Sequence, residues 1–152
     1  MRTTIIATVI AITLLASSCK KIQNNVLIKG KWNVERVKSD FLTLENSMDL
    51  LIPGYISNNE CCQYIVDFKD DQTVTGTFYK DKQVMQIDSG EWKLDEFNLL
   101  YIQLGKYING SFDINKDSKR FYKLTTDSNS AQFLPSQVTV SKVVMDIRRL
   151  KD

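Results

Sequence analysis

The sequence of 152 residues contains no histidine. Without an imidazole there is no Ser-His-Asp or Cys-His catalytic group and no zinc site built on histidine ligands. The sequence also lacks a glycine-rich phosphate-binding loop, and no pair of carboxylates stands out as an acid and base couple. We therefore expect a protein that is not an enzyme and that uses no cofactor and no metal ion.

An excess of charge of one sign is missing as well. Lys and Arg total 20 and Asp and Glu total 18, and the two signs are interspersed along the chain. Binding to nucleic acid calls for a basic patch or stripe, which this sequence does not contain. Hydrophobic residues make up 43% of the chain, which is ample for a packed core, so we do not expect intrinsic disorder.

The first 18 residues differ from the rest of the chain. Arg2 is the single charge, an apolar run follows it, and the small residues Ala16, Ser17 and Ser18 precede Cys19. This order is typical of a secretory signal peptide. The apolar run is shorter than the roughly 17 to 25 residues that a membrane-spanning helix needs. We therefore expect residues 1–18 to be removed.

A cysteine directly after small residues resembles the lipobox of bacterial lipoproteins, and the lysines that follow Cys19 are similar to those of lipoproteins from Bacteroidetes-type bacteria. The resemblance implies that Cys19 becomes the first mature residue and carries the lipid. Several acyl chains bind a membrane stably, whereas one chain binds only marginally. Residues 19–27 then form a lipidated tether, and the protein is expected on the outer membrane, facing the periplasm or the cell surface.

Two further cysteines, Cys61 and Cys62, are adjacent. In an oxidising compartment they could form a vicinal disulfide, bond to another chain, or stay reduced. Neighbouring side chains of a β-strand point to opposite faces. If both residues belong to a strand, one thiol is expected to face inward and the other outward.

Alternation of apolar and polar residues dominates the sequence after the tether. It occurs at residues 63–70, 73–80, 90–95 and 143–150, and this period of two predicts half-buried antiparallel strands. Turn residues at 69–72, 80–82, 88–90, 95–96, 109–110 and 115–118 predict a meander, in which each strand pairs with the next. Apolar residues at helical spacing predict one short helix over 40–51, between the first two strands, which Pro53 and Gly54 end.

The first predicted strand opens with Gly30-x-Trp32. This motif resembles the start of the first strand in lipocalins and other calycins, and most of residues 28–150 is similar to the lipocalin-like lipoproteins of Bacteroidetes; the barrel domain is expected over residues 28–152. The resemblance implies an all-β fold, an antiparallel up-and-down barrel of eight strands. It also implies that an arginine near the end of the last strand closes the barrel over the indole ring. Arg149 shares the strand parity of Met145 and Ile147, so it is the expected partner of Trp32.

The inward side of the predicted strands is rich in large side chains, and two functions fit it. A barrel of eight strands can hold one small molecule, so these side chains could line a site for a small apolar ligand, with Gly76 leaving room. Alternatively they fill the barrel, and the protein is an interaction module: an inhibitor or a subunit of an envelope complex. The residues proposed to line the site are Tyr64, Val66, Phe68, Phe78 and Trp92, with Phe112 and Phe121 as additions.

The lipobox resemblance gives a direct prediction. In protein purified from membranes, mass spectrometry should find an N-terminus at Cys19 that carries acyl chains. The Cys19→Ala variant should leave the membrane fraction. A mature protein that begins elsewhere, or a Cys19→Ala variant that stays firmly bound to the membrane, contradicts the lipid anchor.

Overall fold

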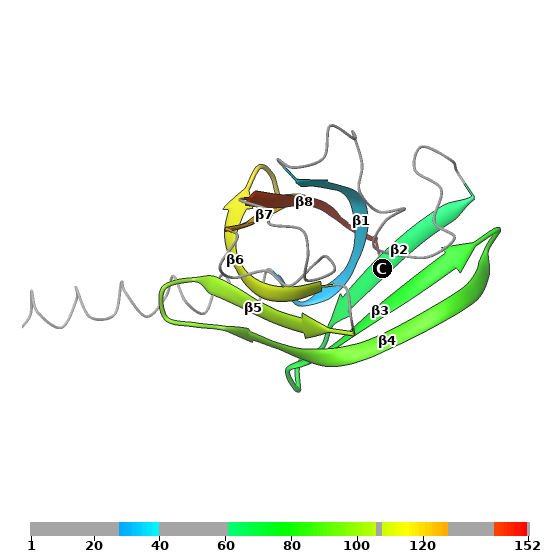
Figure 1. Cartoon of the computed structure of the whole chain (residues 1–152), viewed down its shortest axis with the longest axis horizontal. Coiled ribbons are helices and arrows are strands. Elements are labelled where there is room, and N and C mark those ends of the chain that lie inside the picture. The colour runs from blue at the N-terminus through cyan, green and yellow to red at the C-terminus, as the bar shows by residue number, and fades with distance from the viewer. Residues whose placement is uncertain (1–27, 40–60, 106–107, 128–141, 152) are drawn as a thin grey trace, which may run out of the picture.

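A computed structural model of the chain describes residues 28–39, 61–105, 108–127 and 142–151. Its strands form a closed antiparallel barrel in which each strand pairs with the next and the last pairs with the first (Figure 1). The predicted all-β barrel of eight antiparallel strands is therefore confirmed. The predicted signal peptide, the tether and the helix at 40–51 lie outside the described residues.

The strands follow one another around the barrel in the order of the sequence. Turns of a few residues join most neighbours, so the register of these pairs is set locally. The strands are β1 (Gly30–Ser39), β2 (Cys62–Phe68), β3 (Thr73–Lys80), β4 (Gln83–Leu94), β5 (Leu99–Leu104), β6 (Ile108–Lys116), β7 (Phe121–Asp127) and β8 (Lys142–Arg149).

The alternation seen in the sequence places the core inside the barrel. Along β2 and β3 every second side chain is buried, as expected for strands with one face inward. Six of the seven residues predicted to line the interior have exposed fractions of 3% or less; they are Tyr64, Val66, Phe68, Phe78, Trp92 and Phe112.

Phe121 is a correction to the predicted interior. Its side chain is 40% exposed, and Arg148 lies over its ring with the guanidinium carbon 4.8 Å from the ring centre. Tyr122 is buried in its place, opposite Ile147 of β8. Directly opposed residues share a face of the sheet, so the inward parity of Ile147 fixes Tyr122 inside and Phe121 outside.

Two of the predicted turns are wrong. Residues 88–90 lie within β4 and residues 109–110 lie within β6. Gly90 sits where neighbouring strands come close, since a Cβ atom there would be 1.7 Å from the carbonyl oxygen of Gln103. A glycine at this position therefore permits the close approach of two backbones and does not mark a turn.

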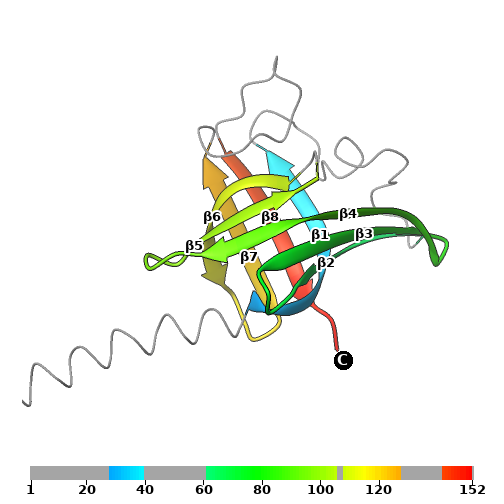
Figure 2. The same cartoon turned by 90° about the horizontal axis from the view of Figure 1, so that it is seen from below.

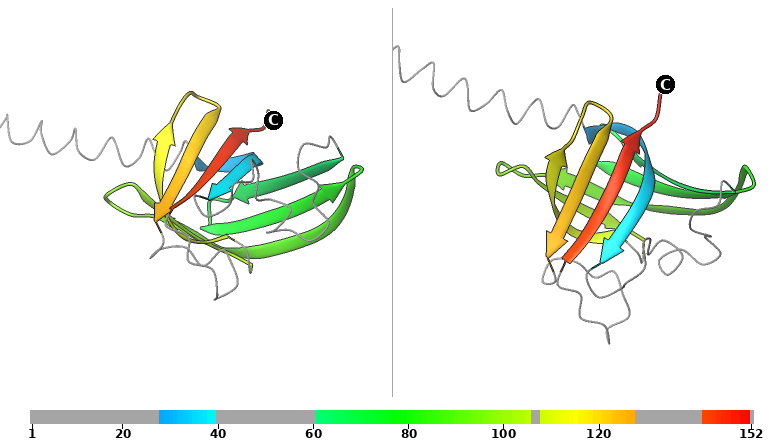
Figure 3. Two further views of the ribbon diagram at one scale, coloured as in Figure 1. Left: turned by 45° about the horizontal axis from the view of Figure 1, so that its top comes forward. Right: turned by 90° about the horizontal axis from the view of Figure 1, so that it is seen from above.

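β2, β3 and β4 continue past the barrel on one side, as Figures 2 and 3 show. β1 pairs with β2 only up to Tyr64, and β5 pairs with β4 only from Gly90 onward. We call this extension the arm; it comprises residues 61–63, 77–80 and 83–88. A two-residue turn at its tip joins β3 to β4, where Asp81 and Lys82 both have positive φ (50° and 65°), as tight hairpins require.

The seam between β1 and β8 joins the two ends of the barrel. Trp32 pairs with Arg149, whose guanidinium carbon lies 5.6 Å from the centre of the indole ring. The contact expected from strand parity is thus present. The indole Nε1 donates to the carbonyl of Ile28 (2.7 Å), and Nη2 of Arg149 donates to the carbonyl of Lys29 (3.0 Å). Gly30, which lies between these two carbonyls and Trp32 in the sequence, has a positive φ of 104°.

Replacing the indole should open this seam. Trp32 has no exposed surface, so Trp32→Ala should lower the free energy of unfolding by about 3–5 kcal/mol, the usual range for a buried aromatic side chain. Denaturant unfolding measures the loss, and Phe97→Ala is the control because Phe97 is 82% exposed. Equal stability of the two variants would contradict the structural role of Trp32.

Candidate functional site

The barrel interior is packed at the point where the sequence leaves most room. Gly76 faces inward from β3, but a Cβ atom there would lie 2.1 Å from the hydroxyl oxygen of Tyr64 and 2.9 Å from a methyl carbon of Leu104. The side chain of Tyr64 therefore occupies the space that the glycine leaves. The glycine and the tyrosine fit each other as parts of a core.

The buried rings near the other end also contact one another. The ring centres of Trp32 and Tyr122 are 4.6 Å apart, and Phe68 meets Trp92 edge to face at 5.6 Å. These are ordinary separations for aromatic pairs in a core. Burial raises the pKa of the Tyr122 hydroxyl, which fits its position among these rings. The predicted lining residues are thus brought together, and Phe68, Trp92 and Tyr64 make their contacts with protein groups.

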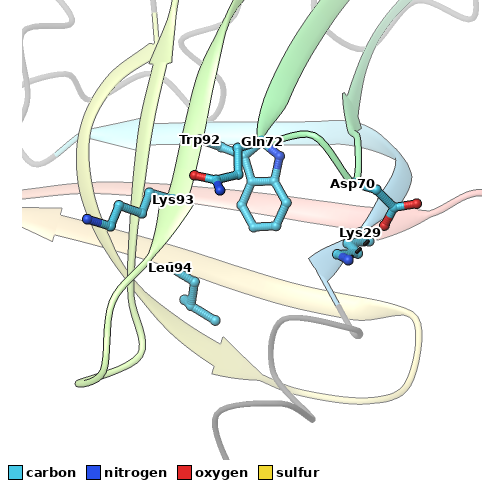
Figure 4. Close-up of a pocket in the computed structure, with 6 residues that line it drawn as sticks. All are labelled: Lys29, Asp70, Gln72, Trp92, Lys93 and Leu94. Atoms are coloured by element: carbon cyan, nitrogen blue, oxygen red, sulfur yellow. Dashed lines mark ion pairs between the residues drawn. The ribbon is translucent and has the colours of Figure 1, made fainter.

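A depression in the surface lies beside Lys29 and Trp92, at the edge of this core (Figure 4). It measures about 240 Å³ and is lined by Lys29, Asp70, Gln72, Trp92, Lys93 and Leu94. Nζ of Lys29 pairs with Asp70 at 2.7 Å, and Trp92 is held below by a hydrogen bond from its Nε1 to the carbonyl of Lys69 (3.0 Å). An exposed ion pair of this kind contributes little. The depression therefore combines one aromatic side chain, Trp92, with the ion pair of Lys29 and Asp70.

The arm carries an exposed apolar cluster, formed by Val84, Met85 and Ile87. Their exposed fractions are 52%, 57% and 63%. Val84 pairs with Tyr79 and Ile87 pairs with Thr77, both on the outer face of β3. A register shift between Phe78 and Tyr79 adds an extra residue to β4 here. The cluster therefore lies on the outside of the arm.

Polar side chains take the inner face of the same segment. Gln86 is opposite Phe78 and Asp88 is opposite Gly76, so both face inward, and Nε2 of Gln86 donates to Oδ2 of Asp88 (2.9 Å). In the barrel, apolar residues face inward and polar residues outward. In this part of β4 the arrangement is inverted. The sequence analysis missed this segment because the turn predicted at 88–90 divided the strand.

The backbone of β4 is also open along the arm. Residues 83–89 pair with β3, and pairing with β5 begins only at Gly90, so within the described strands this edge has no second neighbour. Such an edge presents backbone N–H and C=O groups to an incoming strand. Apolar side chains and an open edge occur together on one element.

The adjacent thiols differ from the prediction of opposite faces. Cys61 precedes β2 and Cys62 begins it, so strand alternation does not apply to the pair. Their Sγ atoms are 2.6 Å apart. The interaction with Cys62, followed by burial, raises the pKa of the Cys61 thiol. Cys61 is partly exposed and Cys62 is buried.

Comparison with known proteins gives no relative: no family model, curated protein or solved structure matches the chain. Within residues 28–39, 61–105, 108–127 and 142–151, no helix has the length and apolar character to cross a membrane. The same residues contain no group of three or more Cys, Asp or Glu side chains placed to bind a metal ion.

Gly76 gives a test of whether the interior is filled. Gly76→Ala should lower the free energy of unfolding by about 1–3 kcal/mol, because the added methyl group would collide with the ring of Tyr64. In open space the same change would stabilise the protein by about 0.4–1 kcal/mol, through the unfolded chain. Denaturant unfolding decides by the sign, with Thr75→Ala on the outward parity as the neighbouring control.

Proposed function

We propose that this chain is a lipid-anchored, lipocalin-like envelope protein that binds another protein through its arm, as an inhibitor or as a subunit of an envelope complex. It performs no catalysis and needs no cofactor, metal ion or nucleic acid. The observation that carries the proposal is the inverted alternation of β4, with Val84 and Ile87 outside and Gln86 and Asp88 inside.

Three exposed apolar side chains on one hairpin are unfavourable in water. Burying them against a partner would therefore contribute to the free energy of binding. Exposed apolar side chains that are grouped in this way mark contact sites for other macromolecules. The open edge of β4 adds backbone groups that can pair with an extended segment of a partner, while Val84 and Ile87 contact its side chains. Apolar contact and backbone pairing together define a site for a protein partner.

Packing inside the barrel favours this function over the carriage of a small apolar ligand. A carrier needs dry space, yet Tyr64 fills the position that Gly76 leaves, and two pairs of rings, Trp32 with Tyr122 and Phe68 with Trp92, contact each other. A ligand would have to displace these side chains, which would cost the packing that each contributes. The barrel then acts as a rigid base for the arm.

Anchoring at Cys19 would determine which partners the arm reaches. The tether of residues 19–27 spans at most about 30 Å when fully extended. A protein bound in this way stays close to the outer membrane, with Lys20 and Lys21 near the lipid headgroups. Its partner is therefore expected in the same envelope layer, on the periplasmic side or at the cell surface.

Site-specific photo-crosslinking in the native envelope tests the proposal. A photoreactive residue in place of Ile87 should give a discrete adduct with another protein. The same residue in place of Tyr101 should give none, although Tyr101 is also a half-exposed apolar residue (47%) on the outer side of the barrel. A crosslink from both positions alike, or from Tyr101 alone, contradicts a site on the arm.

A second variant separates binding from folding. The double variant Val84→Thr, Ile87→Thr should abolish the adduct formed by a photoreactive residue at position 85. Because both side chains are exposed, its stability should stay within about 0.5 kcal/mol of the parent protein. If the adduct persists, the apolar cluster is not the contact. Saturable binding of fatty acids by a protein with an unaltered arm would instead support the ligand carrier.

A further inference from the structure

Cys61 and Cys62 are placed for bond formation with each other. Their Sγ atoms are 2.6 Å apart, not far beyond a disulfide bond of about 2.05 Å. Cys61 lies in the turn before β2, which lets its side chain swing beside that of Cys62 instead of to the opposite face. The approach follows from the boundary of the strand.

The surroundings hold this dithiol in place and leave one side open. The backbone N–H of Asp81, in the turn at the tip of the arm, donates to the carbonyl of Cys61 (2.7 Å). A surface depression of about 310 Å³ begins at Cys61 and is lined further by Gln63, Ile65, Tyr79 and Lys82. Cys62 is only 6% exposed. A small reagent can therefore reach Cys61 first and Cys62 only through it.

We propose that Cys61 and Cys62 form a reversible vicinal disulfide by exchange with a small-molecule disulfide. The Cys61 thiolate attacks one sulfur of the external disulfide, forms a mixed disulfide and releases one thiolate. The Cys62 thiol then gives its proton to solvent and attacks Sγ of Cys61, which releases the second thiolate. Two protein thiols are oxidised, and one external disulfide is reduced to two thiols.

The product is a labile bond rather than a structural one. Adjacent Cα atoms across a trans peptide are about 3.8 Å apart, below the about 4.4–6.8 Å that disulfides usually span. A disulfide closed over such a short distance is strained and easily reduced. It closes no loop of chain, so it removes little entropy from the unfolded state. These properties suit a redox-sensitive site within the arm.

The test uses the full chain with Cys19→Ser in detergent solution, so that only the two adjacent thiols remain. After incubation with oxidised glutathione and quenching in acid, intact-mass spectrometry should show the loss of both thiol hydrogens with no glutathione attached. An excess of reduced glutathione should then restore both thiols. The exchange should become faster as the pH rises, since thiolate is the attacking form and the pKa of Cys61 is raised.

Single variants provide the matched controls. With Cys62→Ser in the same chain, one glutathione should accumulate on Cys61, because no second thiol can displace it. With Cys61→Ser, the buried Cys62 should react at least tenfold more slowly than Cys61 does alone. The proposal is overturned if the chain with both cysteines accumulates bound glutathione, forms disulfide-linked dimers or keeps both thiols. A disulfide that resists reduced glutathione overturns its reversibility.

Discussion

The barrel depends on the contact between its first and last strands. Trp32 and Arg149 come from opposite ends of the domain, yet they are direct partners across the β1–β8 seam. Each of the other strand pairs in the ladder joins neighbours in sequence, so it closes over a shorter stretch of chain. Without the seam, β1 and β8 would both be open edges. The indole and the guanidinium also hold the carbonyls of Ile28 and Lys29, which fixes the entry to the barrel.

The core inside the barrel is closely packed. Tyr64 reaches across to Gly76 from the neighbouring strand, so one large and one absent side chain complement each other. A core built in this way gains stability from its close packing. The exposed apolar groups of the arm add nothing to that packing. Val84, Met85 and Ile87 are three exposed apolar side chains on one strand, whereas Phe97, Tyr101 and Phe121 are exposed singly on separate elements.

Local alternation predicted several of the strands, because one inward face per strand repeats every second residue, whereas the closed barrel of eight strands was implied by the calycin resemblance. Alternation located the inward row of β2 and β3, and it selected Arg149 as the arginine that the resemblance implied for Trp32. It failed where pairing with a neighbouring strand decides the outcome. The register with β8 places Phe121 outside the barrel, and Gly90 lies within β4 at a close approach to β5 instead of in a turn. The β4 part of the arm, residues 83–88, could not be predicted from alternation, because its polar and apolar faces are reversed and a register shift interrupts its period.

An open edge beside apolar side chains carries a risk of unselective pairing with other strands. The arm has several features that limit it: the irregular register at Phe78 and Tyr79, the short length of the open segment, and charged Asp81 and Lys82 at the tip. Bulges, short edges and lysine are common means of preventing aggregation at strand edges. Pairing is then restricted to a partner that accommodates the bulge and the charged turn. The carbonyl of Cys61 accepts a hydrogen bond from the N–H of Asp81 in that same turn. This hydrogen bond links the thiol pair directly to the tip of the arm.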